Sequence, residues 1–243
     1  MELTKHDYID RYHEGFARVN LKRKWNFIDE QGNLLSDQWF NWCMSFQEGF
    51  AVVYLNDKYN FIDKQGKLLS KQWFGNCLSF HEEVAKVELK GRWNFIDKQG
   101  KLLSGQWFDN CDSFREGFAV VRLNGEFNFI DKQGNYLSDK WFDWCDDFHE
   151  GIAHVKLNNK YNLINQQGNL LSDAWFTICG KFNEGFARVI LNYKWNFIDY
   201  HGYILSDKWF DYCSTFNNGV ATVMINGTNK TINTKGEILD ETN

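Results

Sequence analysis

The chain has 243 residues, of which 43% are hydrophobic and 18% aromatic, so it can build a buried core and is not globally disordered. Its formal net charge is −5, and no stripe of Lys and Arg stands out, which argues against a nucleic-acid-binding protein. No apolar run approaches the length needed to span a membrane, and residues 1–10 lack an apolar segment typical of a secretory signal. We therefore expect a cytoplasmic protein with neither nucleic acid nor membrane as partner.

The dominant feature of the sequence is a repeat of 34 residues without insertions. Seven copies begin near residues 14, 48, 82, 116, 150, 184 and 218. One column is always Ala: Ala17, Ala51, Ala85, Ala119, Ala153, Ala187 and Ala221. Another is Asn in six copies: Asn26, Asn60, Asn94, Asn128, Asn162 and Asn196. These internal matches predict a single repeat domain over residues 1–243.

In chain order, each repeat begins with a predicted strand. In the second copy, Ala51, Val53 and Leu55 alternate with the changeable Val52 and Tyr54, and period-two alternation is typical of a half-buried strand. The sequence NDK at residues 56–58 predicts a tight turn into a second strand.

The next segment, DKQG at residues 63–66, predicts a four-residue turn that starts at Asp and ends at Gly. A short third strand is expected at residues 67–70. For the connecting limb of the first copy, Ser36 either caps a short helical turn that carries Trp39, Cys43 and Phe46 on one side, or the limb is irregular.

One repeat cannot bury its own aromatic residues, so neighbouring repeats must cover them. The pattern predicts an all-β fold of seven tandem hairpin repeats that form an open, superhelical, β-solenoid-like array, with a closed seven-bladed propeller of small blades as the alternative. The end repeats favour the open array because they are atypical and polar. Asn229 and Thr231 replace aromatic or apolar residues in the last copy, and Lys5-His6 replaces Trp-Phe in the first limb.

The chain contains KWNFID at residue 24, RWNFID at residue 92 and KWNFID at residue 194, together with FQEGFA at residue 46, FREGFA at residue 114 and FNEGFA at residue 182. This combination resembles the WG repeat family of bacterial proteins, also called KWG repeats, over essentially the whole chain. Asn replaces the Gly that follows Trp in that family, and a segment of the form LLSDxWFDxC replaces its proline-bearing limb. The resemblance implies a binding or interaction array and no catalytic chemistry.

Six cysteines also recur at one phase: Cys43, Cys77, Cys111, Cys145, Cys179 and Cys213. No pairing stands out in so uniform a column, and free Cys is among the most buried residue types, so we expect buried thiols in the core. One further column is Glu in six copies: Glu14, Glu48, Glu82, Glu116, Glu150 and Glu184. Acid–base catalysis needs two groups whose surroundings separate their pKa values, and these six near-identical surroundings do not. His13, His81 and His149 occupy the same position in alternate repeats, and the repeats between them have Gln47 and Arg115 there. A row of metal-binding histidines through adjacent repeats is therefore not formed. We expect no catalytic, cofactor-binding or metal site, and hence a non-enzymatic protein.

Recognition is expected where the copies differ. The changeable positions of the first strand of each repeat predict a variable strand face that binds a partner protein. Its candidate residues are Arg18, Tyr54, Lys86, Glu88, Arg122, His154, Lys156 and Arg188. A second variable row contains the aromatic residues Trp42, Trp144 and Tyr212, which would suit a carbohydrate-binding repeat lectin as the alternative function.

Overall fold

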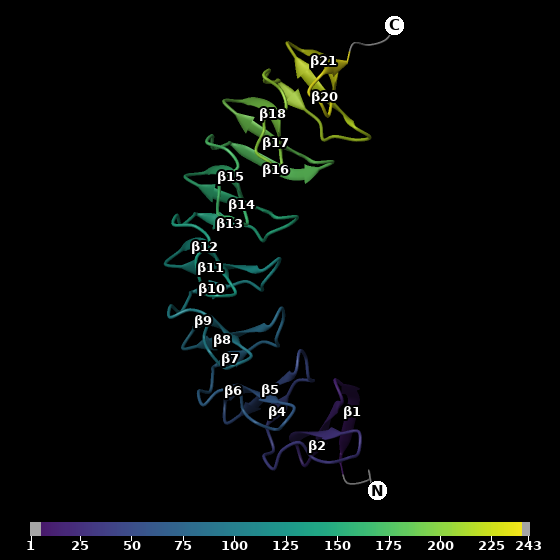
Figure 1. Cartoon of the computed structure of the whole chain (residues 1–243), viewed down its shortest axis with the longest axis vertical. Coiled ribbons are helices and arrows are strands. Elements are labelled where there is room, and N and C mark those ends of the chain that lie inside the picture. Colours follow the sequence, from purple (N-terminus) through teal and green to yellow (C-terminus); the bar gives the residue numbers. More distant parts are fainter. Residues whose placement is uncertain (1–5, 240–243) are drawn as a thin grey trace. The chain divides into compact units, whose positions relative to one another are not determined.

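The structure is a computed structural model, and it describes residues 6–239 (Figure 1). Within this range every regular element is a β-strand, and there is no helix, so none is long and apolar enough to cross a membrane. Lys5, which belongs to the polar first limb, lies outside the described residues.

The described chain forms two compact units, residues 6–124 with 130–135 and residues 125–129 with 136–239. The first unit contains three complete sheets, β1-β2-β3, β4-β5-β6 and β7-β8-β9. Their strands are β1 (Tyr8–His13), β2 (Phe16–Leu21), β3 (Lys24–Asp29), β4 (Trp42–Cys43), β5 (Phe50–Leu55), β6 (Lys58–Asp63), β7 (Asn76–Cys77), β8 (Val84–Leu89) and β9 (Arg92–Asp97). The expectation of one domain over residues 1–243 stays a prediction.

The second unit contains three further sheets, β13-β14-β15, β16-β17-β18 and β19-β20-β21-β22. Their strands are β13 (Trp144–Cys145), β14 (Ile152–Leu157), β15 (Lys160–Asn165), β16 (Ile178–Asn183), β17 (Phe186–Leu191), β18 (Lys194–Asp199), β19 (Tyr212–Cys213), β20 (Val220–Ile225), β21 (Thr228–Asn233) and β22 (Ile238–Leu239). The remaining sheet, of β10 (Asn110–Cys111), β11 (Phe118–Leu123) and β12 (Glu126–Asp131), contains the boundary between the units. The expected all-β array of hairpin repeats is confirmed, and none of the described sheets closes on itself.

The long strands of each repeat form a tight hairpin, as the alternation and turn signals predict. In the second repeat, Leu55 of β5 pairs with Lys58 of β6, which leaves Asn56 and Asp57 as the two turn residues. Their φ angles are 48° and 61°, the left-handed conformation that a two-residue hairpin turn requires. The DKQG turn is also confirmed, since Oδ1 of Asp63 accepts hydrogen bonds from the backbone N–H groups of Gln65 and Lys67.

Both faces of the β5–β6 hairpin are buried, which differs from the half-buried strand that we expected. On one face of the β5–β6 hairpin, Ala51, Val53 and Ile62 pack with Phe27 and other apolar side chains of the first repeat and its limb. On the other face, Val52 and Phe61 pack with side chains of the third repeat. The repeats therefore bury each other's hairpins face to face, as tandem stacking requires.

The connecting limb is irregular and contains no helical turn. The limb of the second repeat forms a β-bridge between Phe74 and Tyr59 and then contains the two-residue strand β7. The expected third strand is reduced to a bridge between Leu68 and Ile62. Buried Asn60 holds the limb in place instead. Its Nδ2 donates to the carbonyl oxygens of Ser70 (2.8 Å) and Gln72 (3.3 Å), and its Oδ1 accepts from the N–H of Phe61 (2.8 Å). These bonds explain why Asn, a poor strand former, recurs inside a strand.

The Glu column links consecutive repeats. Glu14 accepts backbone N–H groups of Glu48 (2.7 Å) and Gly49 (2.9 Å), and it forms an ion pair with Lys64 (3.1 Å). Partial burial opposes the charged form, but the hydrogen bonds from Lys64, Gly49 and Glu48 outweigh it and lower the pKa of Glu14. In the second unit, Glu184 accepts the equivalent N–H groups of Asn218 and Gly219, both at 2.9 Å. Glu14 and Glu184 thus each link consecutive repeats within one unit.

Gly66 marks a second point of close contact between repeats. Its φ is +79°, and a Cβ atom at this position would lie 2.4 Å from the carbonyl oxygen of Leu35 in the preceding limb. The repeats can approach this closely only because the turn ends at glycine.

Candidate functional site

In four sheets, the third residue of the second strand reaches the next repeat of the same unit. Where this residue is polar and long enough, it bonds to a backbone carbonyl there. Arg18 Nη1 donates to Cys43 O (3.0 Å), and Arg188 Nη1 donates to Cys213 O (3.1 Å). His154 Nε2 lies 3.0 Å from Gly180 O, and Lys86 Nζ donates to Cys111 O. These four predicted partner-binding residues are therefore half-buried and already engaged within the chain.

Two positions of the same row contradict the expected solvent-facing strand. Val52 is 1% exposed and Val120 is 3% exposed. For Val52, the physical reason is that the third repeat packs on this face of the hairpin and makes it a second interface between repeats. The sequence contained a signal for this burial, namely the valines themselves. A row of solvent-facing residues seldom alternates between cations and β-branched apolar residues.

The remaining predicted residues come together at one end of the sheets. We define the hairpin rim as the first residue of the first strand, the fifth of the second and the second of the third in each sheet. Its members are Tyr8, Asn20 and Trp25; Trp42, Tyr54 and Tyr59; Asn76, Glu88 and Trp93; Asn110, Arg122 and Phe127; Trp144, Lys156 and Tyr161; Ile178, Ile190 and Trp195; and Tyr212, Met224 and Asn229. The rim lies beside the tight hairpin turns.

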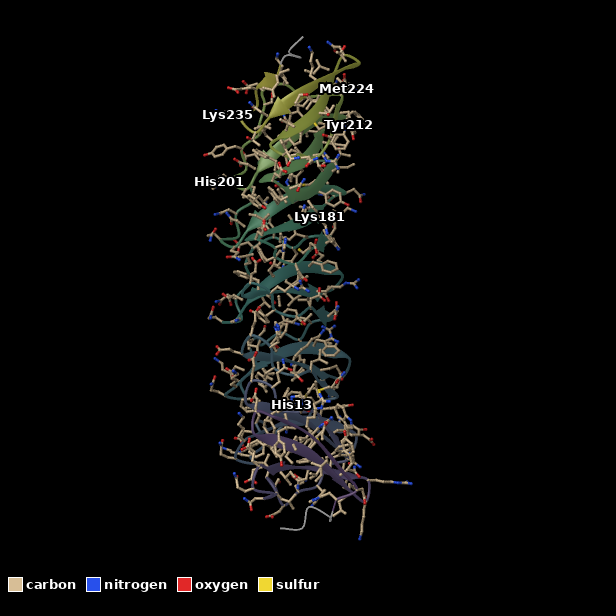
Figure 2. All side chains as sticks on the ribbon, turned by 90° about the vertical axis from the view of Figure 1, so that its right-hand side faces the viewer. His13, Lys181, His201, Tyr212, Met224 and Lys235 are labelled. Atoms are coloured by element: carbon tan, nitrogen blue, oxygen red, sulfur yellow. The ribbon has the colours of Figure 1, made fainter. Side chains whose placement is uncertain are left out.

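The pairing of strands makes the rim residues of one sheet direct neighbours. Trp42 pairs with Tyr54, and Trp144 pairs with Lys156. Tyr212 pairs with Met224, and Figure 2 shows these two residues together on one edge, with His201 and Lys235 on the other. Tyr54, Lys156 and Met224 of the first variable row thus share one surface in each sheet with the second variable row, although the two rows were predicted as alternative surfaces.

The rim is partly exposed and carries aromatic residues. Trp42 is 36% exposed, Trp144 is 39% exposed, and Ile178 and Tyr212 are each 45% exposed. Cross-strand contacts order the rim side chains. The rings of Tyr54 and Tyr59 lie 4.6 Å apart, and Lys156 Nζ lies 5.5 Å above the ring of Tyr161.

The character of the rim changes from repeat to repeat. In the third repeat it is polar, since Glu88 pairs with Asn76 and accepts the backbone N–H of Gly91. In the sixth repeat it is apolar, with Ile178, Ile190 and Trp195 as neighbours. Arg122 is exposed and pairs with Asn110 in the fourth repeat. Within each unit, the strand frame is thus constant while the rim changes in charge and shape.

The cysteine column lies in the core. All six thiols are free, and five of the six residues are buried, while Cys179 is half-buried. Burial raises the pKa of the Cys111 thiol to about 12. Among residues 6–239, no group of three or more His, Cys, Asp or Glu residues is arranged to hold a metal ion.

The fold and the rim define an all-β tandem-repeat protein. The family model described as "WG containing repeat" matches residues 6–25, 27–59, 95–127, 129–161, 163–195 and 197–228. The chain belongs to this family, as its KWNFID segments indicate. It is consequently a repeat scaffold.

Among curated proteins, none matches the sequence. Solved structures with a similar trace include Hsv2 of Kluyveromyces lactis, at 7% identity and a TM-score of 0.37, covering 94% of this chain and 91% of that one. Another is PorZ, described as a bacterial surface component of the type-IX secretion system of Porphyromonas gingivalis, at 8% identity and a TM-score of 0.33, covering 100% of this chain and 39% of that one.

Proposed function

We propose that the protein is a non-enzymatic scaffold that binds a partner protein through its hairpin rim. The observation that carries this proposal is the position of the variation. Both faces of the hairpins are used for packing between repeats, whereas the rim changes in charge and shape and remains partly exposed.

The composition of the rim supports a protein partner. Interfaces are enriched in Trp, Tyr, Met and Arg, and the rim presents Trp42, Trp144, Tyr212, Met224 and Arg122. Side chains ordered by cross-strand contacts lose little further conformational entropy on binding, which favours affinity.

The test compares two edges of the same unit. A triple variant, Trp144→Ser, Ile178→Ser and Tyr212→Ser, removes exposed apolar side chains from the rim of the second unit. Tyr203→Ser is the matched control, because Tyr203 is 71% exposed and lies in the turn at the opposite end of β18. Partners captured from the source cells are compared by quantitative mass spectrometry. A protein captured by the wild type and the control but lost from the triple variant supports the proposal, and equal capture by all three contradicts it.

A carbohydrate-binding lectin is the second candidate, and the exposed rings of Trp42, Trp144 and Tyr212 favour it. A glycan array probed with the wild type and the triple variant separates the two candidates. Glycan binding that requires Trp144 and Tyr212, without rim-dependent protein capture, would replace the first proposal with the second.

A further inference from the structure

The rim of the first repeat borders an open, shallow pocket of about 520 Å³. The pocket is lined by Tyr8, Arg18, Asn20, Arg23 and Trp25, all in the first unit. Tyr8, Asn20 and Trp25 are the rim residues of this sheet, and the two arginines add guanidinium groups beside them. The pocket thus combines two aromatic rings, an amide and cationic groups.

The charge at this pocket is opposite in sign to that of the whole chain. Lys22, Arg23 and Lys24 are consecutive and exposed, and no other repeat has three consecutive cations in its hairpin turn. Arg18 is committed to other groups, since its Nε donates to Asp10 Oδ2 (3.0 Å) and its Nη1 to the next repeat.

The acidic groups near the pocket are also engaged. Asp10 is paired with Arg18, and Asp7 accepts the backbone N–H of Lys22 at 2.7 Å. Within residues 6–239, no carboxylate lies at ion-pair distance from the side chains of Arg23 or Lys24. These two cations can therefore meet an anionic group from outside the chain.

The turn of the first repeat has the same left-handed backbone as the other hairpin turns but contains different residues. Lys22 and Arg23 have φ angles of 51° and 65°, in the left-handed region that Gly and Asn tolerate best. The fourth and seventh repeats fill the same two positions with Asn124-Gly125 and Asn226-Gly227. The first repeat instead places two long cationic side chains at these two positions.

We propose that this pocket binds an acidic peptide segment of a partner protein. This inference rests on the proposed function and specifies the chemistry of one segment of that partner. Carboxylates of the segment bind Arg23 and its neighbouring lysines, because a guanidinium group matches a carboxylate in a bidentate geometry. An apolar side chain of the segment packs against Tyr8 and Trp25. β1 is the edge strand of this sheet, so an extended segment can also pair with its backbone.

The arrangement of the rings favours a peptide over an acidic sugar. The guanidinium carbon of Arg18 lies 5.6 Å from the centroid of the Trp25 ring and covers one face of it. Tyr8 meets Trp25 edge to face, with centroids 6.0 Å apart and an interplanar angle of 70°. A sugar ring stacks on an open flat platform, and here the platform is partly occupied by the chain itself.

The test uses a turn exchange that separates binding from folding. The double variant Lys22→Asn, Arg23→Gly installs the Asn-Gly turn of the fourth and seventh repeats and removes two cations. The probe is a fluorescein-labelled peptide of sequence EEFEE, with KKFKK as its charge-reversed control, and binding is measured by fluorescence anisotropy at low salt. We expect the variant to bind EEFEE at least about tenfold more weakly, because it loses charge-assisted hydrogen bonds to the peptide. The same variant should unfold at a higher temperature than the wild type, because its turn is unstrained.

Tyr193→Gly is the matched control, since it changes the second turn position of the sixth repeat, where φ is 64°, without removing a cation. It should also raise the unfolding temperature and leave EEFEE affinity unchanged. Equal EEFEE affinity in wild type and double variant, or tighter binding of KKFKK, would overturn the inference. An oligogalacturonate that competes more effectively than unlabelled EEFEE would assign the pocket to an acidic sugar, and a wild-type dimer that the double variant converts to monomer would assign it to a second copy.

Failure of this inference is distinct from failure of the proposed function. If EEFEE does not bind while capture of a protein still depends on Trp144, Ile178 and Tyr212, the acidic-segment inference fails and the scaffold proposal stands. If EEFEE binds through Lys22 and Arg23 while no captured protein depends on the rim of the second unit, the pocket is confirmed and the broader proposal fails.

Discussion

Replacing Asn162 by Ala tests the claim that the Asn column holds the irregular limbs. Nδ2 of Asn162 donates to the carbonyl oxygens of Ser172 (2.7 Å) and Ala174 (3.2 Å), and Oδ1 accepts from the N–H of Leu163 (2.8 Å). Asn162 and Leu163 are fully buried, so the N–H of Leu163 would lose its partner without access to water. Three lost bonds at about 1 kcal/mol each, plus part of the cost of an unpaired buried donor, give an expected destabilisation of about 3–4 kcal/mol.

The assay is urea unfolding followed by tryptophan fluorescence and by circular dichroism, with agreement of the two signals as the check on two-state behaviour. Asn169→Ala is the matched control, because Asn169 is exposed and contributes only its backbone to the adjacent turn. A surface change of this kind should alter stability by less than about 0.5 kcal/mol. Equal losses for the two variants, or a loss below about 1 kcal/mol for Asn162→Ala, would refute the proposed role of the column.

Four further predictions follow from single contacts. Tyr193→Gly should stabilise the protein by about 1 kcal/mol in urea unfolding, because a 93% exposed side chain leaves a left-handed turn position without losing packing; a loss of stability would contradict the turn assignment. Gly66→Ala should lower the free energy of unfolding by at least about 2 kcal/mol, because the new Cβ would lie 2.4 Å from the carbonyl oxygen of Leu35. An unchanged urea midpoint would show that the repeats are not so closely packed. Cys111→Ser should lower the free energy of unfolding by about 1–3 kcal/mol, and Cys111→Ala should lower it less. Because burial raises the pKa of Cys111 to about 12, a thiol reagent should label it slowly at pH 9 until urea opens the fold. Rapid labelling of the native protein would contradict this. The pKa of Glu14 is lowered on folding, so its stabilising contribution should be present above the unfolded value of about 4.3 and lost as the pH falls through the folded value, and Glu14→Gln should reduce this acid-side loss in urea midpoints measured against pH.

The strands, the hairpin turns and the repeat length follow directly from the sequence because each depends on local chemistry. Alternation in residues 50–55 predicts a strand, and Asn56-Asp57 predicts a left-handed turn, whatever the neighbouring repeats do. The resemblance carried by the KWNFID segments identifies the family for the same reason, since it depends on short recurring motifs.

The limb and the buried second face depend on contacts between segments and could not be predicted in the same way. Trp73-Phe74 has no periodicity that separates a helical turn from an irregular path, and the path is determined by the bonds that Asn60 makes ten and twelve residues ahead. The position of Val52 likewise depends on how the next repeat packs, so an alternating pattern alone assigns it to the wrong environment. The merging of Trp42 and Tyr54 into one surface required the strand register.

Hydroxyl-radical footprinting of the protein bound to a captured partner tests the central claim most directly, because it reports which edge the partner covers. The hairpin rim account predicts that oxidation of Trp144 and Tyr212 falls on binding while oxidation of Tyr203, at the other end of its sheet, is unchanged. Protection of Tyr203 with full oxidation of Trp144 and Tyr212 would contradict it.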